Sequence, residues 1–299
     1  MEFDDLLNTG AVPQDERMAD FVAESRANRN FCYEAAERAA RRVAEDPEAF
    51  RRYLDVQGCF LRYTANNALL ILEQKPEARR LGDMAYWKER GGFVKRTERA
   101  RPVLVMEPGK EYKREDNTYG QYYNAKKLYD VSQTTIPERE WQGPPREYED
   151  HQLIRALISR ASVSIHTAGE EGLPEGVGAW FNPEEHSIYA RKGMGADEIF
   201  RGISRELAHA EYAKGSVEYD RETYGFHAEC ASYILCRRYG IETEGHYALD
   251  SSLQLLEGLD PKEIKRELSL MRDAANHIFD RMEKSLTEQT RGQRNTQER

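Results

Sequence analysis

Residues 205–209 read Arg-Glu-Leu-Ala-His, and this short segment constrains the fold of the chain more than any other. In the H-E-x-x-H arrangement of zinc hydrolases, two histidines four residues apart share one helix face and bind Zn²⁺, while the glutamate acts as general base. Glu206 and His209 occupy the second and last positions of that arrangement. Arg205 replaces the first histidine, and a guanidinium cannot bind a cation because it stays protonated. The segment therefore predicts a metallohydrolase helix that lacks one metal ligand.

Glu229 lies 20 residues after His209 and offers a carboxylate as a further ligand. Asp and Glu are common third ligands in catalytic zinc sites. The elements predicted around the site follow one another along the chain: strands over residues 177–181 and 187–191, the motif helix with Asp197 as N-cap, and a helix over residues 222–239 that ends at Gly240. A hairpin followed by two helices that carry the site predicts an α+β domain.

Two interpretations of this site are opposed. In the first, Arg205 pairs with Glu206 or Glu229, because two facing carboxylates repel each other unless a cation lies between them. The chain is then a pseudo-enzyme in which an internal ion pair replaces the metal. In the second, His209 and Glu229 bind zinc with an additional ligand, and Glu206 is the catalytic base of an active peptidase.

His227 and Cys230 offer another alternative, because they lie three residues apart and could complete a relocated metal site with His209. The simplest alternative is that residues 205–209 form an exposed helix with ordinary surface charges. We favour the internal ion pair, and therefore expect either no cofactor or zinc at a degenerate site. Whether the chain is an enzyme stays open at this point, with the balance against it.

The composition is that of a globular protein. With 299 residues, of which 39% are hydrophobic and 32% are charged, the chain is long enough for two domains. No segment approaches the roughly 18 apolar residues of a membrane span, and the acidic residues 1–5 do not resemble a secretory signal. The four cysteines lack C-x-x-C spacing and predict reduced thiols. We expect a cytoplasmic location and no membrane partner.

Charge divides the chain into a basic and an acidic part. Residues 51–114 hold 15 Lys and Arg against 8 Asp and Glu, whereas residues 141–299 hold 20 against 28. Residues 137–149, with Gly143-Pro144-Pro145 at their centre, have the composition of a linker. We predict three units: residues 1–140, residues 141–252, and a C-terminal helix with a polar tail over residues 253–299. An anionic partner is expected for the first unit only.

The first unit is predicted to be helical with a small sheet. Apolar residues at helical spacing predict two or three helices over residues 15–75, with a restart at Asp46-Pro47. Residues 102–106 are predicted to form a short buried strand, and residues 119–131 its extended partner.

Near the other end of the chain, apolar residues from Ile264 to Met282 recur at steps of three and four, which predicts a long packed helix after Pro261.

Basic and aromatic residues alternate through residues 62–129. Cations follow the phosphates of a single strand and aromatic rings stack on its unpaired bases, so this mixture is typical of single-stranded DNA binding. The alternative is that Trp87 and several tyrosines belong to the core, while the charges form a solvated surface. Composition alone does not decide between these two.

Several segments of the first half resemble the N-terminal single-stranded-DNA-binding domain of ArdC-type anti-restriction proteins. The segments that carry the resemblance are Tyr63-Thr64-Ala65-Asn66-Asn67-Ala68-Leu69-Leu70, Tyr86-Trp87, Gly92-Phe93-Val94-Lys95-Arg96, Arg101-Pro102-Val103-Leu104-Val105 and Leu128-Tyr129-Asp130-Val131-Ser132-Gln133. On the basis of this resemblance and of the basic and aromatic composition, we predict the following DNA contacts: Arg62, Tyr63, Asn66, Trp87, Lys95, Arg96, Arg99 and Tyr129.

Residues 153–243 resemble the zincin-like metallopeptidases of the ImmA/IrrE type. The resemblance implies that Glu206 stands at the general base, that His209 and Glu229 stand at metal ligands, and that Arg205 stands at the missing histidine. ArdC-type proteins join both kinds of domain, and their family role is to protect incoming conjugative DNA from host restriction. The resemblance therefore implies action on transferred single strands in the cytoplasm.

The sequence leads to one favoured function and two alternatives. We predict a single-stranded-DNA-binding, anti-restriction-like accessory protein of a mobile conjugative element, with an inactive metallopeptidase-like second half. The first alternative is the active zinc metallopeptidase described above. The second is an acidic protein-interaction module that acts on a host defence enzyme, which makes a host defence protein the second expected partner.

Overall fold

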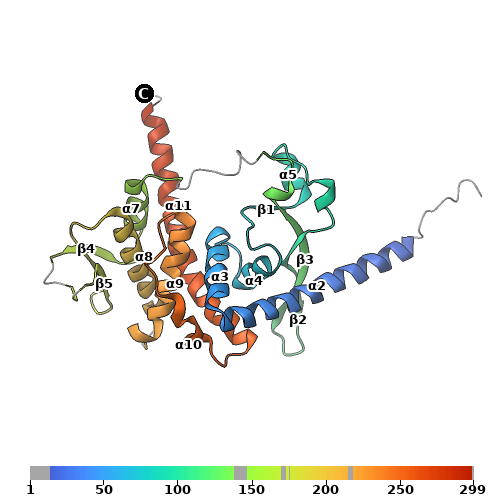
Figure 1. Ribbon diagram of the computed structural model, residues 1–299, viewed down its shortest axis with the longest axis horizontal. Coiled ribbons are helices and arrows are strands. Elements are labelled where there is room, and N and C mark those ends of the chain that lie inside the picture. The colour runs from blue at the N-terminus through green and yellow to red at the C-terminus, as the bar shows by residue number, and fades with distance from the viewer. Residues whose placement is uncertain (1–13, 138–146, 170–172, 175, 215–217, 298–299) are drawn as a thin grey trace, which may run out of the picture.

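Three helices open the N-terminal half of the computed structural model (Figure 1). The structure describes residues 14–137, 147–169, 173–174, 176–214 and 218–297. The three helices are α2 (Gln14–Glu45), α3 (Pro47–Cys59) and α4 (Ala65–Gln74), as predicted for residues 15–75. Asp46 starts α3, because its side chain accepts a hydrogen bond from the N–H of Glu48 at 2.9 Å and Pro47 stands in the first turn.

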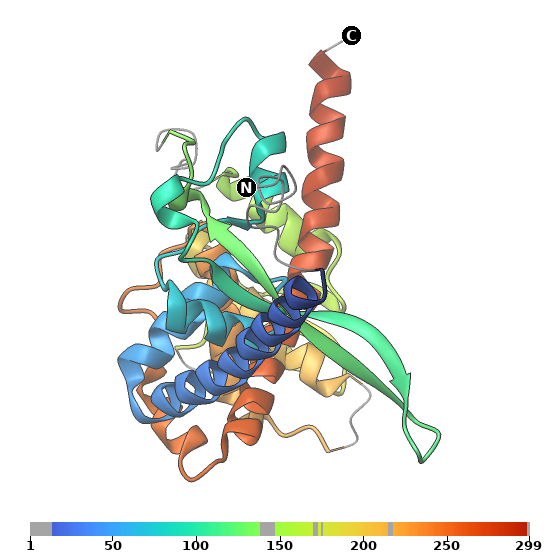
Figure 2. The same cartoon turned by 90° about the vertical axis from the view of Figure 1, so that its right-hand side faces the viewer.

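A three-stranded antiparallel sheet follows, with the strand order β1-β3-β2. Its strands are β1 (Leu81–Gly82), β2 (Val103–Lys113) and β3 (Tyr119–Asp130), which confirms the strands predicted near residues 102–106 and 119–131. Both long strands continue beyond the helices that cover them, so the β2–β3 hairpin projects from the body (Figure 2). The short helices at the other end of this sheet are α5 (Met84–Glu89), η1 (Arg96–Glu98) and η2 (Val131–Gln133).

Helix α4 closes the open edge of β2 with two side-chain amides. Asn67 and Gln74 lie two helical turns apart, and each amide bonds both backbone groups of one strand residue. Asn67 Nδ2 donates to the carbonyl of Met106 at 2.9 Å, and Asn67 Oδ1 accepts from the N–H of Met106 at 2.8 Å. Gln74 makes the same pair with Leu104, both at 2.8 Å. These bonds block the edge against pairing with another strand.

The C-terminal half contains a second three-stranded sheet, ordered β4-β6-β5, with β4 parallel and β5 antiparallel to β6. Its elements are α7 (Asp150–Ser159), β4 (Ser164–Ala168), β5 (Ala179–Asn182), β6 (Ser187–Arg191), α8 (Ala196–Ala213) and α9 (Arg221–Tyr239). The predicted hairpin and both site helices are confirmed. The predicted N-cap is wrong: Gly195 caps α8, and Asp197 lies in the first turn, where its charge favours the helix dipole.

The chain then runs through η4 (Leu249–Ser251) and α10 (Ser252–Leu256) into the long helix α11 (Pro261–Gln297). The apolar stripe predicted from Ile264 to Met282 is buried. Much of the segment predicted to be a polar tail continues this helix instead, and the end of α11 stands out from the body (Figure 1).

The predicted α+β class is confirmed, with a helical N-terminal part that carries a small sheet and a C-terminal part that ends in a long helix. The linker predicted at residues 137–149 falls largely on residues 138–146, which lie outside the described residues. Among the helices of the described residues, none combines the length and the apolar character that crossing a membrane requires.

One hydrophobic core extends through both halves of the chain. At the centre of this contact, α3 packs against α9 where Gly58 faces Arg237. The Asp55 carboxylate accepts a hydrogen bond from the hydroxyl of Tyr233 at 2.9 Å, and Nε of Arg237 lies 2.6 Å from the same oxygen. The two halves are therefore joined by apolar packing and by a shared carboxylate.

Gly58→Ala is expected to lower the free energy of unfolding, although alanine is the better helix former. A Cβ at this position would lie 2.7 Å from Cβ of Arg237 and 3.0 Å from the carbonyl oxygen of Ile234. The overpacking cost of about 1 to 3 kcal/mol is therefore expected to exceed the helix-propensity gain of about 1 kcal/mol. Urea denaturation measures the difference.

Gly225→Ala is the matched control. Gly225 lies inside α9, and an added Cβ there meets nothing within 4 Å. This variant is expected to be neutral or more stable by up to about 1 kcal/mol. If both substitutions changed stability alike, the close approach of α3 and α9 at Gly58 would be contradicted.

Candidate functional site

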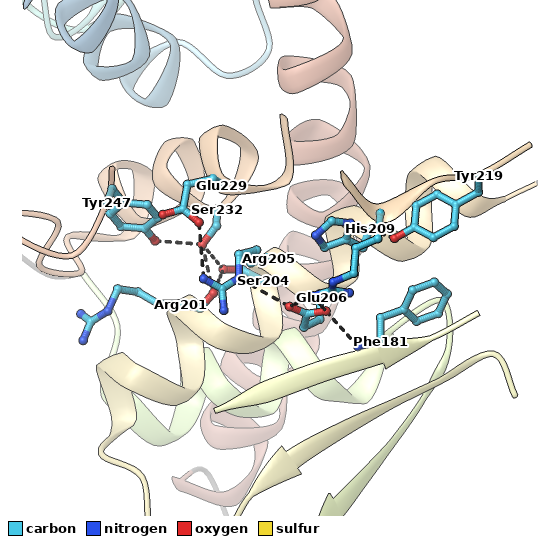
Figure 3. Close-up of polar contacts among 11 residues, drawn as sticks. Phe181, Arg201, Ser204, Arg205, Glu206, His209, Tyr219, Glu229, Ser232 and Tyr247 are labelled. Atoms are coloured by element: carbon cyan, nitrogen blue, oxygen red, sulfur yellow. Dashed lines mark hydrogen bonds and ion pairs between the residues drawn. The ribbon is translucent and has the colours of Figure 1, made fainter. Parts of the chain in front are cut away.

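Helices α8 and α9 bring the motif segment and Glu229 together (Figure 3). Two buried serines join the helices, with Ser204 Oγ and Ser232 Oγ 2.7 Å apart. Ser232 also contacts the hydroxyl of Tyr247 at 2.8 Å. Small side chains at the crossing allow the two helices to approach closely. Arg205 and Glu229 consequently reach each other across it.

Glu206 lies at the centre of the site and is completely buried. Its Oε2 accepts a hydrogen bond from the backbone N–H of Phe181 on the edge strand β5 at 2.8 Å. The guanidinium of Arg221 lies 2.9 Å from Oε1 and 2.8 Å from Oε2. Both carboxylate oxygens are therefore engaged by other groups of the protein.

Arg205 contacts both carboxylates, as the ion-pair interpretation predicts. Its Nε lies 3.5 Å from Oε1 of Glu206, and its NH1 lies 3.4 Å from Oε2 of Glu229. Burial opposes the charge on this guanidinium, but the two carboxylates outweigh it and raise the pKa of Arg205 above its ordinary value. Arg205 is thus the charged link between α8 and α9.

Arg221 is a second cation in the site, and the sequence prediction missed it. It is the first residue of α9, and its guanidinium lies over the ring of Trp180, 3.6 Å from the centroid. No motif spacing identifies Arg221. Its guanidinium reaches Glu206 because the first residue of α9 lies next to Trp180 of β5 in the folded chain. Two guanidinium groups therefore neutralise two carboxylates.

His209 is buried beside these cations and is held neutral. Its Nδ1 lies 2.9 Å from the hydroxyl of Tyr219. Burial, together with the nearby charges of Arg221 and Arg205, lowers the pKa of His209 from 6.5 to about 3. The imidazole therefore carries no charge at neutral pH.

The donors of the motif do not fit a zinc ion as they are arranged. Glu206 is engaged by Phe181 and Arg221, and Glu229 is engaged by Arg205. In the part of the chain that the structure describes, no cluster of three or more His, Cys, Asp and Glu side chains is suited to hold a metal ion. Two guanidinium groups beside the donors also repel a divalent cation.

The relocated site with His227 and Cys230 is not assembled either. Nε2 of His227 lies 2.7 Å from Oε2 of Glu267 on α11. Cys230 is completely buried, and burial raises the pKa of its thiol well above the ordinary value. A metal binds the thiolate, which this environment disfavours. His227 thus contacts α11, whereas Cys230 lies in the hydrophobic core.

Two of the aromatic residues predicted to contact DNA are buried. Trp87 has no exposed surface, and its Nε1 donates to the carbonyl of Tyr129 at 3.0 Å. Tyr129 is 3% exposed, and its hydroxyl donates to the carbonyl of Arg99. Neither ring has a face available to a base. We correct the prediction for these two residues: they pack with Val94 and Val131 at the end of the first sheet.

The other predicted contacts divide into engaged and exposed side chains. Arg62 lies 3.4 Å from Asp280 and stacks over the Phe279 ring, so it joins the first half to α11. Tyr63 and Asn66 are half-buried. The exposed members are Lys95, Arg96 and Arg99. Nζ of Lys95 donates to the carbonyl of Ser132 at 3.0 Å.

The fold and the site define an α+β chain whose two motif helices carry carboxylates neutralised by arginine. The chain is similar to the metal-free crystal structure of the antirestriction protein ArdC from plasmid R388, with a TM-score of 0.49, 20% identity, and coverage of 76% of this chain and 86% of that one. The Mn(II)-bound structure of the same protein gives 0.48, 20%, 74% and 85%. No protein-family profile and no curated protein matches the chain. Both structures are of an ArdC antirestriction protein, and the sequence segments quoted above resemble the ArdC type.

We predict that the stability loss follows the burial of each charged partner in the site. Arg221→Met is expected to cost about 3 to 5 kcal/mol, because it takes the nearer cation away from the completely buried carboxylate of Glu206. Glu206→Gln is expected to cost less, about 1 to 3 kcal/mol, because the charge it leaves without a partner is that of Arg221, which is 26% exposed. Arg205→Met is expected to cost about 1 kcal/mol, because that side chain is 35% exposed and its contacts are longer. Urea denaturation at neutral pH measures all three. A larger loss for Arg205→Met than for Arg221→Met would contradict this order.

Acid is expected to destabilise the fold through His209. The unfolded chain protonates this imidazole near pH 6.5, whereas the folded chain resists protonation down to about pH 3. Since the unfolded state binds more protons between these values, the free energy of unfolding decreases as the pH falls through this window. His209→Gln should flatten the dependence, as measured by chemical denaturation across the window. His151→Gln, at an exposed histidine, is the control and should leave it unchanged.

Proposed function

We propose that the chain binds single-stranded DNA without sequence specificity through its N-terminal half, as an anti-restriction-like accessory protein of a mobile conjugative element. Its second half has no peptidase activity in this proposal and acts as a structural partner of the first. The observation that carries the proposal is a set of exposed cations near the end of the first sheet. We call residues 88–101, which contain them, the basic turn.

The basic turn combines α5, η1 and the loops beside them. Its exposed cations are Lys88, Arg90, Lys95, Arg96, Arg99 and Arg101. Among the ion pairs of the described residues, none involves these side chains, whereas Arg62 on the same half is paired with Asp280. Phe93 adds an aromatic ring that is 57% exposed. Exposed cations that make no ion pair with another described residue are suited to contact the phosphates of a single strand.

The absence of peptidase activity is supported by the charges of the second half. A zinc peptidase needs a metal with an open position and a carboxylate free to act as base. Here Glu206 accepts hydrogen bonds on both oxygens, and Arg205 bridges it to Glu229. Arg205 and Arg221 neutralise the carboxylates of Glu206 and Glu229, and in this proposal that neutralisation stabilises the fold.

Arg96→Ala combined with Arg99→Ala is expected to weaken binding of a single-stranded oligonucleotide. Each phosphate contact that is lost lowers the slope of log affinity against log salt by about 0.7, so two contacts weaken binding by about tenfold or more at low salt. Fluorescence anisotropy over a salt series measures both quantities. Lys192→Ala combined with Arg266→Ala removes two exposed cations from the other half and is the matched control.

Two results would contradict the proposal. If the unsubstituted chain bound no single-stranded oligonucleotide at low salt, or if both pairs of substitutions weakened binding equally, the basic turn would not be a DNA interface. For the second half, the measurement is the zinc content of the purified chain. One tightly held zinc ion per chain would overturn the structural role and favour the peptidase alternative.

A further inference from the structure

The burial of Trp87 and Tyr129 leaves open which rings a base could stack on, since single-strand binding needs aromatic faces as well as cations. The β2–β3 hairpin projects beyond the helices that cover its base (Figure 2). Four tyrosines of these two strands are exposed. Their exposed fractions are 37% for Tyr112, 69% for Tyr119, 52% for Tyr122 and 45% for Tyr123. The hairpin therefore offers aromatic rings to the solvent.

Strand alternation divides the four tyrosines between the two faces of the hairpin. On β3, Tyr122 shares a face with Gly120 and Lys126, which we call the even face, while Tyr119 and Tyr123 point to the opposite one. Tyr112 pairs with Gly120 across the strands and thus lies on the even face. The ring centroids of Tyr112 and Tyr122 are 4.3 Å apart. Only the even face therefore carries two tyrosine rings in contact.

A β-bulge places Tyr112 on this face. Pro108 pairs with Tyr123, but Glu111 pairs with Gln121, so β2 contains one more residue than β3 between these pairs. A regular register would set Tyr112 opposite Tyr119 and turn its ring to the other face. The extra residue reverses the side on which the later residues of β2 point. The tyrosine pair is thus a product of the irregular register.

Gly120 gives the ring of Tyr112 the space it occupies. A Cβ at Gly120 would lie 2.4 Å from Cζ of Tyr112 and 2.7 Å from its hydroxyl oxygen. The ring therefore lies against the bare backbone of β3, next to Tyr122. The bulge and the glycine together hold two exposed rings side by side on one face of a projecting hairpin.

The charges around this pair are mixed. Lys110 and Arg114 are exposed, and no ion pair among the described residues includes them. Lys113 pairs with Tyr119 and lies on the opposite face, and Glu111, Glu115 and Asp116 are exposed acids of the same hairpin. Further along the even face, Nζ of Lys126 lies 3.0 Å from Glu107 and 3.6 Å from Asp83, so it offsets one of these two negative charges.

The even face leads toward the basic turn. Asp83 caps α5 by accepting from the N–H of Tyr86 at 2.8 Å. The guanidinium of Arg90 lies over the ring of Tyr86, 3.8 Å from its centroid. Lys126 contacts Asp83, so a path of alternating cationic, acidic and aromatic side chains connects the even face to residues 88–101.

We propose that Tyr112 and Tyr122 on the even face form a base-stacking site for single-stranded DNA, with Lys110 and Arg114 contacting its phosphates. The inference rests on the proposed function and names a second part of the same interface. Unpaired bases expose the faces that such rings bind, whereas the bases of a duplex are stacked on each other. The site is therefore selective for single strands and tolerant of sequence.

The test compares two matched double variants of the full chain. Tyr112→Ser with Tyr122→Ser removes both rings of the even face, and Tyr119→Ser with Tyr123→Ser removes two rings of the opposite face. Affinity for a labelled oligodeoxythymidylate is measured at fixed salt, after circular dichroism has shown that both variants fold. The even-face variant is expected to bind about tenfold more weakly, and the opposite-face variant about as well as the unsubstituted chain.

A second probe separates stacking from charge. An abasic oligonucleotide keeps the phosphates but offers no bases, so the unsubstituted chain and the even-face variant should bind it equally. Tyr112→Phe with Tyr122→Phe keeps the rings and should retain affinity for the oligodeoxythymidylate. Equal losses in both serine variants, or no loss in the even-face variant, would overturn the stacking site.

The failure of this inference is distinguishable from the failure of the proposed function. If the unsubstituted chain binds the oligonucleotide and Arg96→Ala with Arg99→Ala weakens it while the tyrosine variants do not, only the stacking site is refuted. If the unsubstituted chain binds no single strand at all, the proposed function is refuted and the stacking site with it.

Discussion

The buried carboxylate of Glu206 is the group around which the second half of the molecule is arranged. Moving a charged carboxylate out of water costs several kcal/mol unless cations and hydrogen bonds replace the solvent. Here α9 provides Arg221, β5 provides the N–H of Phe181, and α8 itself provides Arg205. Three separate elements therefore converge on one side chain. Their relative placement cannot change without leaving a buried charge unpaired.

The same cations determine the chemistry of the neighbouring groups. Two guanidinium groups offset the carboxylates of Glu206 and Glu229, and the neutral imidazole of His209 adds no charge. A divalent ion added to this balanced cluster would bring two uncompensated positive charges into a partly buried site. The electrostatics that stabilise the helix pair thus disfavour a divalent ion in the arrangement that the described residues adopt.

Much of this arrangement could be predicted from local signals in the sequence. Asp46-Pro47 and Gly240 mark helix ends through their own backbone preferences, and the contact of Arg205 with both carboxylates follows from residue types on adjacent helices. Arg221 could not be found this way, because its approach to Glu206 depends on where α9 starts relative to β5. Nor does composition tell which aromatic ring is buried: Trp87 is inside and Tyr122 outside, and the face that Tyr112 occupies depends on a bulge.

The second half also stabilises the first half by direct contacts from α11 to the turn after α3. Helix α3 ends at Cys59, and just beyond it Arg272 of α11 donates from Nε to the carbonyl of Leu61 at 3.2 Å and from NH2 to the carbonyl of Arg62 at 3.1 Å. Leu61 and Arg62 lie in the turn after α3, where backbone carbonyls have no helical partner and need other donors. Since the two halves share one core, separating them would expose apolar surface of α3 and leave these carbonyls without Arg272. The second half therefore has a physical task that does not depend on a metal, which is to support the helices on which the basic half is built.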